Sequence, residues 1–99
     1  MKTPHWFPSA DLDAQFAHAL AGTTAVFGAE ALWPGHGWVG LTGIFVFAAL
    51  KEFIFDSVVE AQPFIANLRD FGFYMLGAGI ATATVLIRMF FAAVPKGLL

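Results

Sequence analysis

Two long apolar stretches, interrupted by few polar residues, are the main feature of the chain. Residues 37–59 contain no charged residue before Lys51. Residues 68–94 contain 17 consecutive uncharged residues between Asp70 and Arg88. In an α-helix, about 20 mostly apolar residues cross the hydrocarbon core of a bilayer. Both stretches therefore predict membrane-spanning helices.

A third stretch, residues 13–33, is also apolar but contains more polar side chains. These are Gln15, His18, Thr23, Thr24 and Glu30. The stretch is long enough to span a bilayer, and its polar residues do not form the broad Lys/Arg-rich face of a helix that lies in the membrane surface. We expect it to span, with an interfacial helix as the alternative.

Short connections separate the three stretches. Residues 33–37 form a Pro-Gly turn, and residues 60–66 form a connection in which Pro63 breaks the helix. Asn67 is the expected N-cap of the last helix. Helices joined by such short connections pack as antiparallel neighbours.

The sequence thus predicts an all-α integral membrane protein, a three-helix antiparallel transmembrane bundle in a single membrane domain, residues 1–99. The fallback is an interfacial helix plus a transmembrane hairpin. Residues 1–12, with two prolines and two aromatic residues, are expected to form an interfacial arm.

Small residues recur at helical spacing on all three stretches, which lets helix backbones approach closely in lipid. They are Ala17, Ala21, Gly22 and Ala25 in the first stretch, Gly40 and Gly43 in the second, and Gly72, Gly77 and Gly79 in the third. Three short helices bury little surface against one another. These positions therefore favour further partners, either copies of the chain or other membrane subunits.

The composition supports a lipid environment and excludes some functions. Of the 99 residues, 59% are hydrophobic and 12% are charged, with a net charge of −2. The mean hydropathy is +0.73. A soluble domain is typically about 25% charged, so the lipid bilayer is the expected surrounding. No basic run is present, so we expect no nucleic-acid partner. The absence of cysteine excludes disulfides and thiolate chemistry.

The few charged residues fall on two levels of the predicted bundle. The level nearer the N-terminus gathers a polar intramembrane cluster of His18, Lys51, Glu52, Asp56, Arg69, Asp70 and Tyr74. Glu52 and Asp56 share a helical face at i, i+4 spacing, and like charges on one face need a cation against them. Three interpretations stay open: a salt-bridged rim that sets helix register, a proton, ion or headgroup site, and a contact with a partner protein.

The second level contains two charged residues of opposite sign. Glu30 lies near the end of the first predicted helix and Arg88 near the end of the third, at a similar depth. They form an ion pair, which lowers the cost of burying either, or each extends separately to the interface.

Candidate catalytic and cofactor chemistry is sparse. Ser9 and Ser57 have no nucleophile-elbow setting, and no phosphate-binding glycine loop is present. We therefore expect no enzyme activity. No metal site is expected either, because the chain has no HxxxH or ExxH pair. His18 is the one histidine well placed to ligate a tetrapyrrole. We expect no resident cofactor, the alternative being a lipid or pigment supplied by a larger complex.

Two segments and an upstream helix carry a resemblance. The segments are Lys51-Glu52-Phe53-Ile54-Phe55-Asp56 and Asn67-Leu68-Arg69-Asp70-Phe71-Gly72-Phe73-Tyr74, followed by Gly77, and the helix carries His18 and Gly22. The pattern, KExxxD followed by NxxDFxxYxxG, resembles that of small, holin-sized membrane proteins encoded by phages, prophages and bacteria. The likeness covers roughly residues 18–80. It implies that His18, Lys51, Glu52, Asp56 and Asp70 belong together. We expect the chain to reside in the bacterial inner (cytoplasmic) membrane as a multi-pass protein.

The expected function is non-enzymatic: helix–helix association, as an oligomer or as a subunit of a larger membrane complex. One alternative is a holin-like or ion-conducting assembly, with a lumen lined by Glu52, Asp56 and Thr82 or Thr84. The other alternative is an accessory subunit of a photosynthetic or electron-transfer membrane complex.

Overall fold

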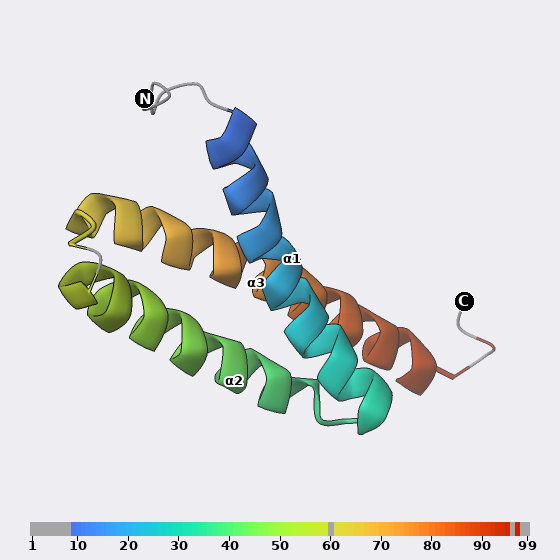
Figure 1. The fold of residues 1–99 in the computed structure, drawn as a ribbon. Helices are drawn as coiled ribbons and strands as arrows, with labels where there is room; N and C mark the ends of the chain where they lie inside the picture. The colour runs from blue at the N-terminus through green and yellow to red at the C-terminus, as the bar shows by residue number, and fades with distance from the viewer. Residues whose placement is uncertain (1–8, 60, 96, 98–99) are drawn as a thin grey trace.

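The described part of the chain folds into three helices, two of which form an antiparallel pair (Figure 1). The structure, a computed structural model, describes residues 9–59, 61–95 and 97. It contains α1 (Ser9–Leu32), α2 (Gly37–Leu50), the π-helix η1 (Lys51–Val59) and α3 (Phe64–Ala93), and no strand within this part of the chain. α2 and η1 are one continuous helix that lies antiparallel to α3, and α1 lies obliquely across α3 (Figure 1). The all-helical, three-helix prediction is confirmed.

Two helices are long and apolar enough to cross a membrane. They are α2–η1, with 23 residues, and α3, with 30 residues. Both coincide with the two stretches that the hydrophobic pattern predicts as spans. α1 has 24 residues, but it is not apolar enough to meet the same criterion.

The helices α1 and α3 begin earlier than the sequence pattern predicts. α1 begins at Ser9, so residues 9–12 are helical and not part of an arm; residues 1–8 lie outside the described residues. α3 begins at Phe64, directly after Pro63 in its N-cap position. Proline is tolerated there because the first N–H groups of a helix have no partner within the helix. The expected N-cap, Asn67, is therefore an interior helical residue.

The second helix changes its winding at Lys51. Over residues 51–59 the helix is a π-helix, in which residues five apart are bonded rather than four. The side-chain contacts follow this spacing, since Lys51 reaches Asp56 and the Ser57 hydroxyl donates to the Glu52 carbonyl. π-Turns are rare and occur often at functional sites. The hydrophobic pattern of the sequence did not indicate this change.

A left-handed residue closes the π-helix. Ala61 has a φ of 55°, a conformation that non-glycine residues adopt rarely. The following N–H, of Gln62, donates to the Asp56 carbonyl at 2.8 Å, a helix-ending bond from beyond the last turn back into it. Pro63 follows Gln62 directly, and α3 begins at the next residue. The connection is therefore shorter than the predicted 60–66.

The turn between α1 and α2 is held by Glu30. Its two carboxylate oxygens accept the backbone N–H groups of Gly35 and Gly37, each at 3.0 Å. Gly35 has a φ of 85°, which glycine adopts without strain. Glu30 thus satisfies an N–H in the turn and one in the first turn of α2, whose own N-cap side chain makes no such bond.

Replacing Glu30 with alanine should loosen this turn. Two hydrogen bonds to a charged acceptor are lost, each worth about 1.5–3 kcal/mol, and the partial exposure of the turn favours the lower end. We expect the midpoint of thermal unfolding, followed by circular dichroism in detergent, to fall clearly. Asp13→Ala removes an exposed acid from the same helix and serves as the control. Equal midpoints for the two variants would contradict the role given to Glu30.

Close helix contacts occur at three of the glycines. A Cβ on Gly22 would collide with the Tyr74 carbonyl, one on Gly40 with the Ala25 carbonyl, and one on Gly77 with the Ala19 carbonyl. These glycines therefore hold α1 against both neighbours. By contrast, a Cβ on Gly43, Gly72 or Gly79 would meet nothing within 4 Å.

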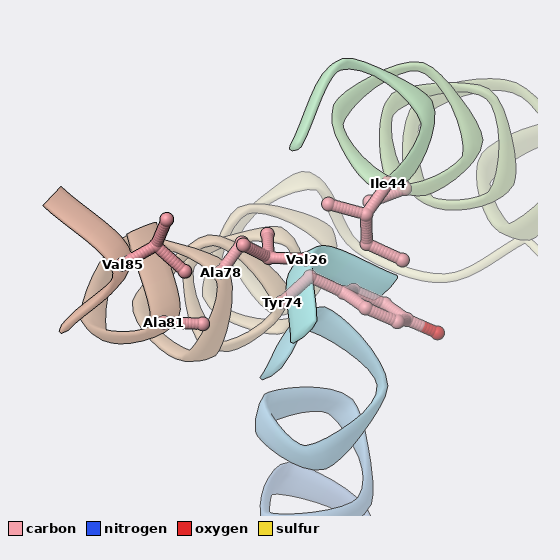
Figure 2. Close-up of a cluster of buried hydrophobic side chains, with 7 residues drawn as sticks. Val26, Ile44, Tyr74, Ala78, Ala81 and Val85 are labelled. Atoms are coloured by element: carbon pink, nitrogen blue, oxygen red, sulfur yellow. The ribbon is translucent and has the colours of Figure 1, made fainter. Parts of the chain in front are cut away.

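The apolar core where the helices meet is small. It consists of Val26, Ile44, Ala48, Tyr74, Ala78, Ala81 and Val85, and Figure 2 shows these side chains between the three helices. Alanine and glycine at the centre explain the close approach of α1 to α3. Most large apolar side chains of the described residues face outward instead.

Candidate functional site

Polar side chains from all three helices meet inside the protein. Five of them are buried, with exposed fractions between 0% and 8%: Gln15, Glu52, Asp56, Asn67 and Asp70. Burying such groups is costly unless they are paired or hydrogen-bonded. We call these five residues, with His18, Lys51, Gln62 and Arg69, the polar cluster.

Lys51 contacts two carboxylates of its own helix and offsets one of their two negative charges. Its Nζ donates to Oε2 of Glu52 at 3.2 Å and to Oδ2 of Asp56 at 3.0 Å. The two acids are almost completely buried, whereas the Lys51 side chain is 35% exposed. The π-helical winding makes this arrangement possible, because it brings residue i+5 onto the face that residue i occupies.

A second set of bonds surrounds Asp70 on α3. Gln15 Nε2 donates to Asp70 Oδ1 at 2.7 Å, and Gln62 Nε2 donates to Asp70 Oδ2 at 3.1 Å. Arg69 Nε lies 3.6 Å from Asp70 Oδ1. The Asp70 carboxylate therefore links α3 both to α1 and to the connection that precedes α3.

His18 is oriented by two neighbours. Its Nδ1 lies 3.2 Å from Gln15 Oε1, and its ring stacks on the Tyr74 ring with centroids 4.5 Å apart. Gln15 thus contacts both His18 and Asp70. The imidazole is only half-buried, so it forms the accessible side of the polar cluster.

Three of these groups are arranged as metal ligands could be. One ligand atom each from His18, Glu52 and Asp70 lies within 4.8 Å of the other two. Within the part of the chain that the structure describes, two fully buried polar atoms lack a hydrogen-bond partner, Glu52 Oε1 and Asn67 Oδ1. The Asn67 amide group donates to Ser57 Oγ and to the Gln62 carbonyl.

The structure brings together the seven residues that the sequence analysis placed in one intramembrane cluster. Their set of partners is larger than predicted, because Gln15, Gln62, Asn67 and Ser57 also take part. Gln15 and Asn67 are polar residues within otherwise apolar helices, and that signal alone could have pointed to them. The π-helical i, i+5 pairing gives no comparable signal in the sequence.

The suggested pairing of Glu30 with Arg88 is not what the described residues show. Both side chains border one cavity of about 160 Å³, with Val85, Met89 and Ala92. The carboxylate of Glu30 instead accepts two backbone N–H groups. These two donors belong to the tight turn that directly follows α1.

The small residues of the sequence analysis divide into two groups. Gly22, Ala25, Gly40 and Gly77 lie at contacts between the helices, and Ala21 packs against the core. Ala17 is exposed, and Gly43, Gly72 and Gly79 have open space around them. Only the residues of the first group form contacts between helices of the same chain.

Comparison with known proteins adds no relative to this description. No protein-family model, no curated protein and no solved structure matches the chain.

Proposed function

We propose that the chain is a small multi-pass membrane protein without enzyme activity. It acts by helix–helix association, as an oligomer or as a subunit of a larger membrane complex. The α2–η1/α3 hairpin is its spanning unit, and α1 is a third span that packs across the hairpin. The resemblance to small phage and bacterial membrane proteins supports a bacterial inner membrane as its location.

The outward-facing apolar surface is the observation that carries this proposal. Only 17% and 22% of the most apolar stretches of α2–η1 and α3 are buried. Leu, Ile, Val and Phe side chains are exposed along the length of both helices, for example Phe45, Val58, Ile80 and Phe90. Soluble proteins rarely expose contiguous apolar surfaces of this extent, whereas lipid or another helix covers them at no cost.

The unused small residues support an association with further helices. Gly43, Gly72 and Gly79 have no atom near their Cβ positions, and Ala17 is exposed. In lipid, helices associate mainly by close packing at such small residues. These positions are therefore where a helix of another subunit can approach.

Crosslinking in native membranes followed by mass measurement tests this proposal. We expect the chain to stay in the membrane fraction through an alkaline wash and to crosslink either to itself or to another membrane subunit. Gly79→Leu should reduce the crosslinked species if that face is used, whereas the matched control Ile80→Leu should not. A chain that is monodisperse in buffer without detergent would overturn the proposal.

Ion conduction receives less support from the positions of the polar groups. The side chains of Glu52 and Asp56 are buried within one copy of the chain, where both pair with Lys51. The Thr82 and Thr84 hydroxyls donate to carbonyls of their own helix, at 2.8 Å each. We therefore expect liposomes containing the protein to stay tight to small ions. A leak that increases with protein density would favour the conducting assembly instead.

A further inference from the structure

The polar cluster holds three groups that bind metal ions in other proteins, and each lies on a different helix. His18 belongs to α1, Glu52 to η1 and Asp70 to α3, and their ligand atoms lie within 4.8 Å of one another. A tetrahedral Zn²⁺ with ligand bonds of about 2.0–2.2 Å keeps its ligand atoms about 3.3–3.6 Å apart. Side-chain shifts of roughly 1 Å would therefore bring the three atoms to binding distance.

Among these three residues, Glu52 has one carboxylate oxygen without a hydrogen-bond partner in the described part of the chain. Glu52 is fully buried, and its Oε2 accepts the Lys51 ammonium group. Its Oε1 is buried as well but accepts no hydrogen bond from any described group. An unsatisfied carboxylate oxygen inside a protein is costly. A bound cation would remove this cost.

Gln15 contacts one of the two ring nitrogens of His18. When the Nδ1 hydrogen is donated to Gln15 Oε1, 3.2 Å away, the Nε2 lone pair remains for a ligand. The same Gln15 donates to Asp70, so one side chain orients two of the three ligands. Outer-shell partners of this kind are a regular feature of metal sites.

The charges of the polar cluster leave room for a cation. Among the described residues, three carboxylates (Glu52, Asp56 and Asp70) face two cationic side chains (Lys51 and Arg69). With a neutral His18, the cluster keeps a negative charge. One imidazole with two carboxylates suits a transition-metal dication, whereas Ca²⁺ and Mg²⁺ prefer oxygen ligands and more of them.

We propose that His18, Glu52 and Asp70 form a binding site for a divalent transition-metal ion of the Zn²⁺ class, which ties α1 to the α2–η1/α3 hairpin. This inference goes beyond helix association and does not depend on the oligomeric state. The sequence analysis expected no metal site because it considered ligand pairs within one helix. Here each helix supplies a single ligand.

Metal binding by the full chain tests the proposal directly. The protein is purified in detergent, treated with a chelator and equilibrated with Zn²⁺, and the bound metal and the thermal midpoint are measured. We expect one Zn²⁺ per chain and a rise in the midpoint that a chelator reverses, because a ligand that binds only the folded state stabilises it. No bound Zn²⁺ or an unchanged midpoint would overturn the proposal.

Conservative variants with matched controls locate the site. His18→Gln, Glu52→Gln and Asp70→Asn should each weaken Zn²⁺ binding by more than the tenfold to hundredfold that is about typical for losing an outer-shell partner. His36→Gln and Asp13→Asn make the same chemical changes outside the polar cluster and should bind as the wild type does. Equal binding by all five variants would mean surface binding only, and the proposal would be wrong.

A spectroscopic measurement on the unaltered chain guards against variants that fail to fold. The ¹⁵N resonances of the imidazole report which ring nitrogen binds a metal. On addition of Zn²⁺ we expect the Nε2 signal of His18 to shift while that of His36 stays in place. A His18 signal that does not respond would contradict the site whatever the variants do.

Discussion

Replacing Gly77 with alanine should separate α1 from α3 and lower the stability of the protein by about 3 kcal/mol. A Cβ at this position would collide with the backbone carbonyl of Ala19. No side-chain rotation can relieve such a contact, because the obstructing atoms are backbone, so the helices must move apart. The effect should appear as a lower midpoint of unfolding in detergent.

Gly79→Ala is the matched control for this variant. It makes the same change two residues further along α3, where a Cβ meets nothing within 4 Å. There we expect no loss, and a gain of about 0.5–1 kcal/mol from the better helix propensity of alanine. Similar stabilities for the two variants would show that the contact between α1 and α3 is not as close as described.

Removing the Lys51 ammonium group should be the most damaging charge change in the chain. In Lys51→Met, the buried acids Glu52 and Asp56 lose the cation that lies 3.2 Å and 3.0 Å from them. Breaking a buried ion pair on one side costs about 3–5 kcal/mol. Since Lys51 is itself about one-third exposed, we expect the lower end of this range, measured by chemical or thermal unfolding in detergent.

Acidification distinguishes this electrostatic loss from a simple packing defect. Protonation removes the uncompensated negative charges, so the stability of Lys51→Met relative to the wild type should recover as the pH falls. Lys51→Arg keeps the charge and should stay close to the wild type. Arg88→Met removes an exposed cation from α3 and should change little. A Lys51→Met defect that is the same at every pH would exclude the pairing as its cause.

Much of the fold followed from the hydrophobic pattern, for a physical reason. A long apolar stretch between charged residues has few structures available other than a helix. The predicted limits of the second helix, residues 37 and 59, therefore agree with those of α2–η1. The start of α3 was not predictable, because a proline can end a helix or begin one, and Pro63 stands in the N-cap position of α3, whereas η1 already ends at Val59. The position of Pro63 in the sequence allows either interpretation.

The site was predictable as a group but not in its bonding. Sparse polar residues in apolar helices must find one another, which gave the association of His18, Lys51, Glu52 and Asp70. The convergence of single polar side chains from three helices depends on the crossing of α1 over α3 (Figure 1). Periodicity within one helix contains no information on that crossing.

The pairing of Lys51 with two acids of its own helix affects how the chain is made. In the proposed membrane protein, a newly translated helix carries its charges toward the bilayer before later segments exist to pair with them. In η1 the cation and both anions lie within six residues of one another, so Lys51 can offset one of the two negative charges as soon as this segment forms a helix. Asp70, by contrast, has its nearest partners on α1 and in the connection before α3. The burial of Asp70 therefore requires that α3 packs against α1.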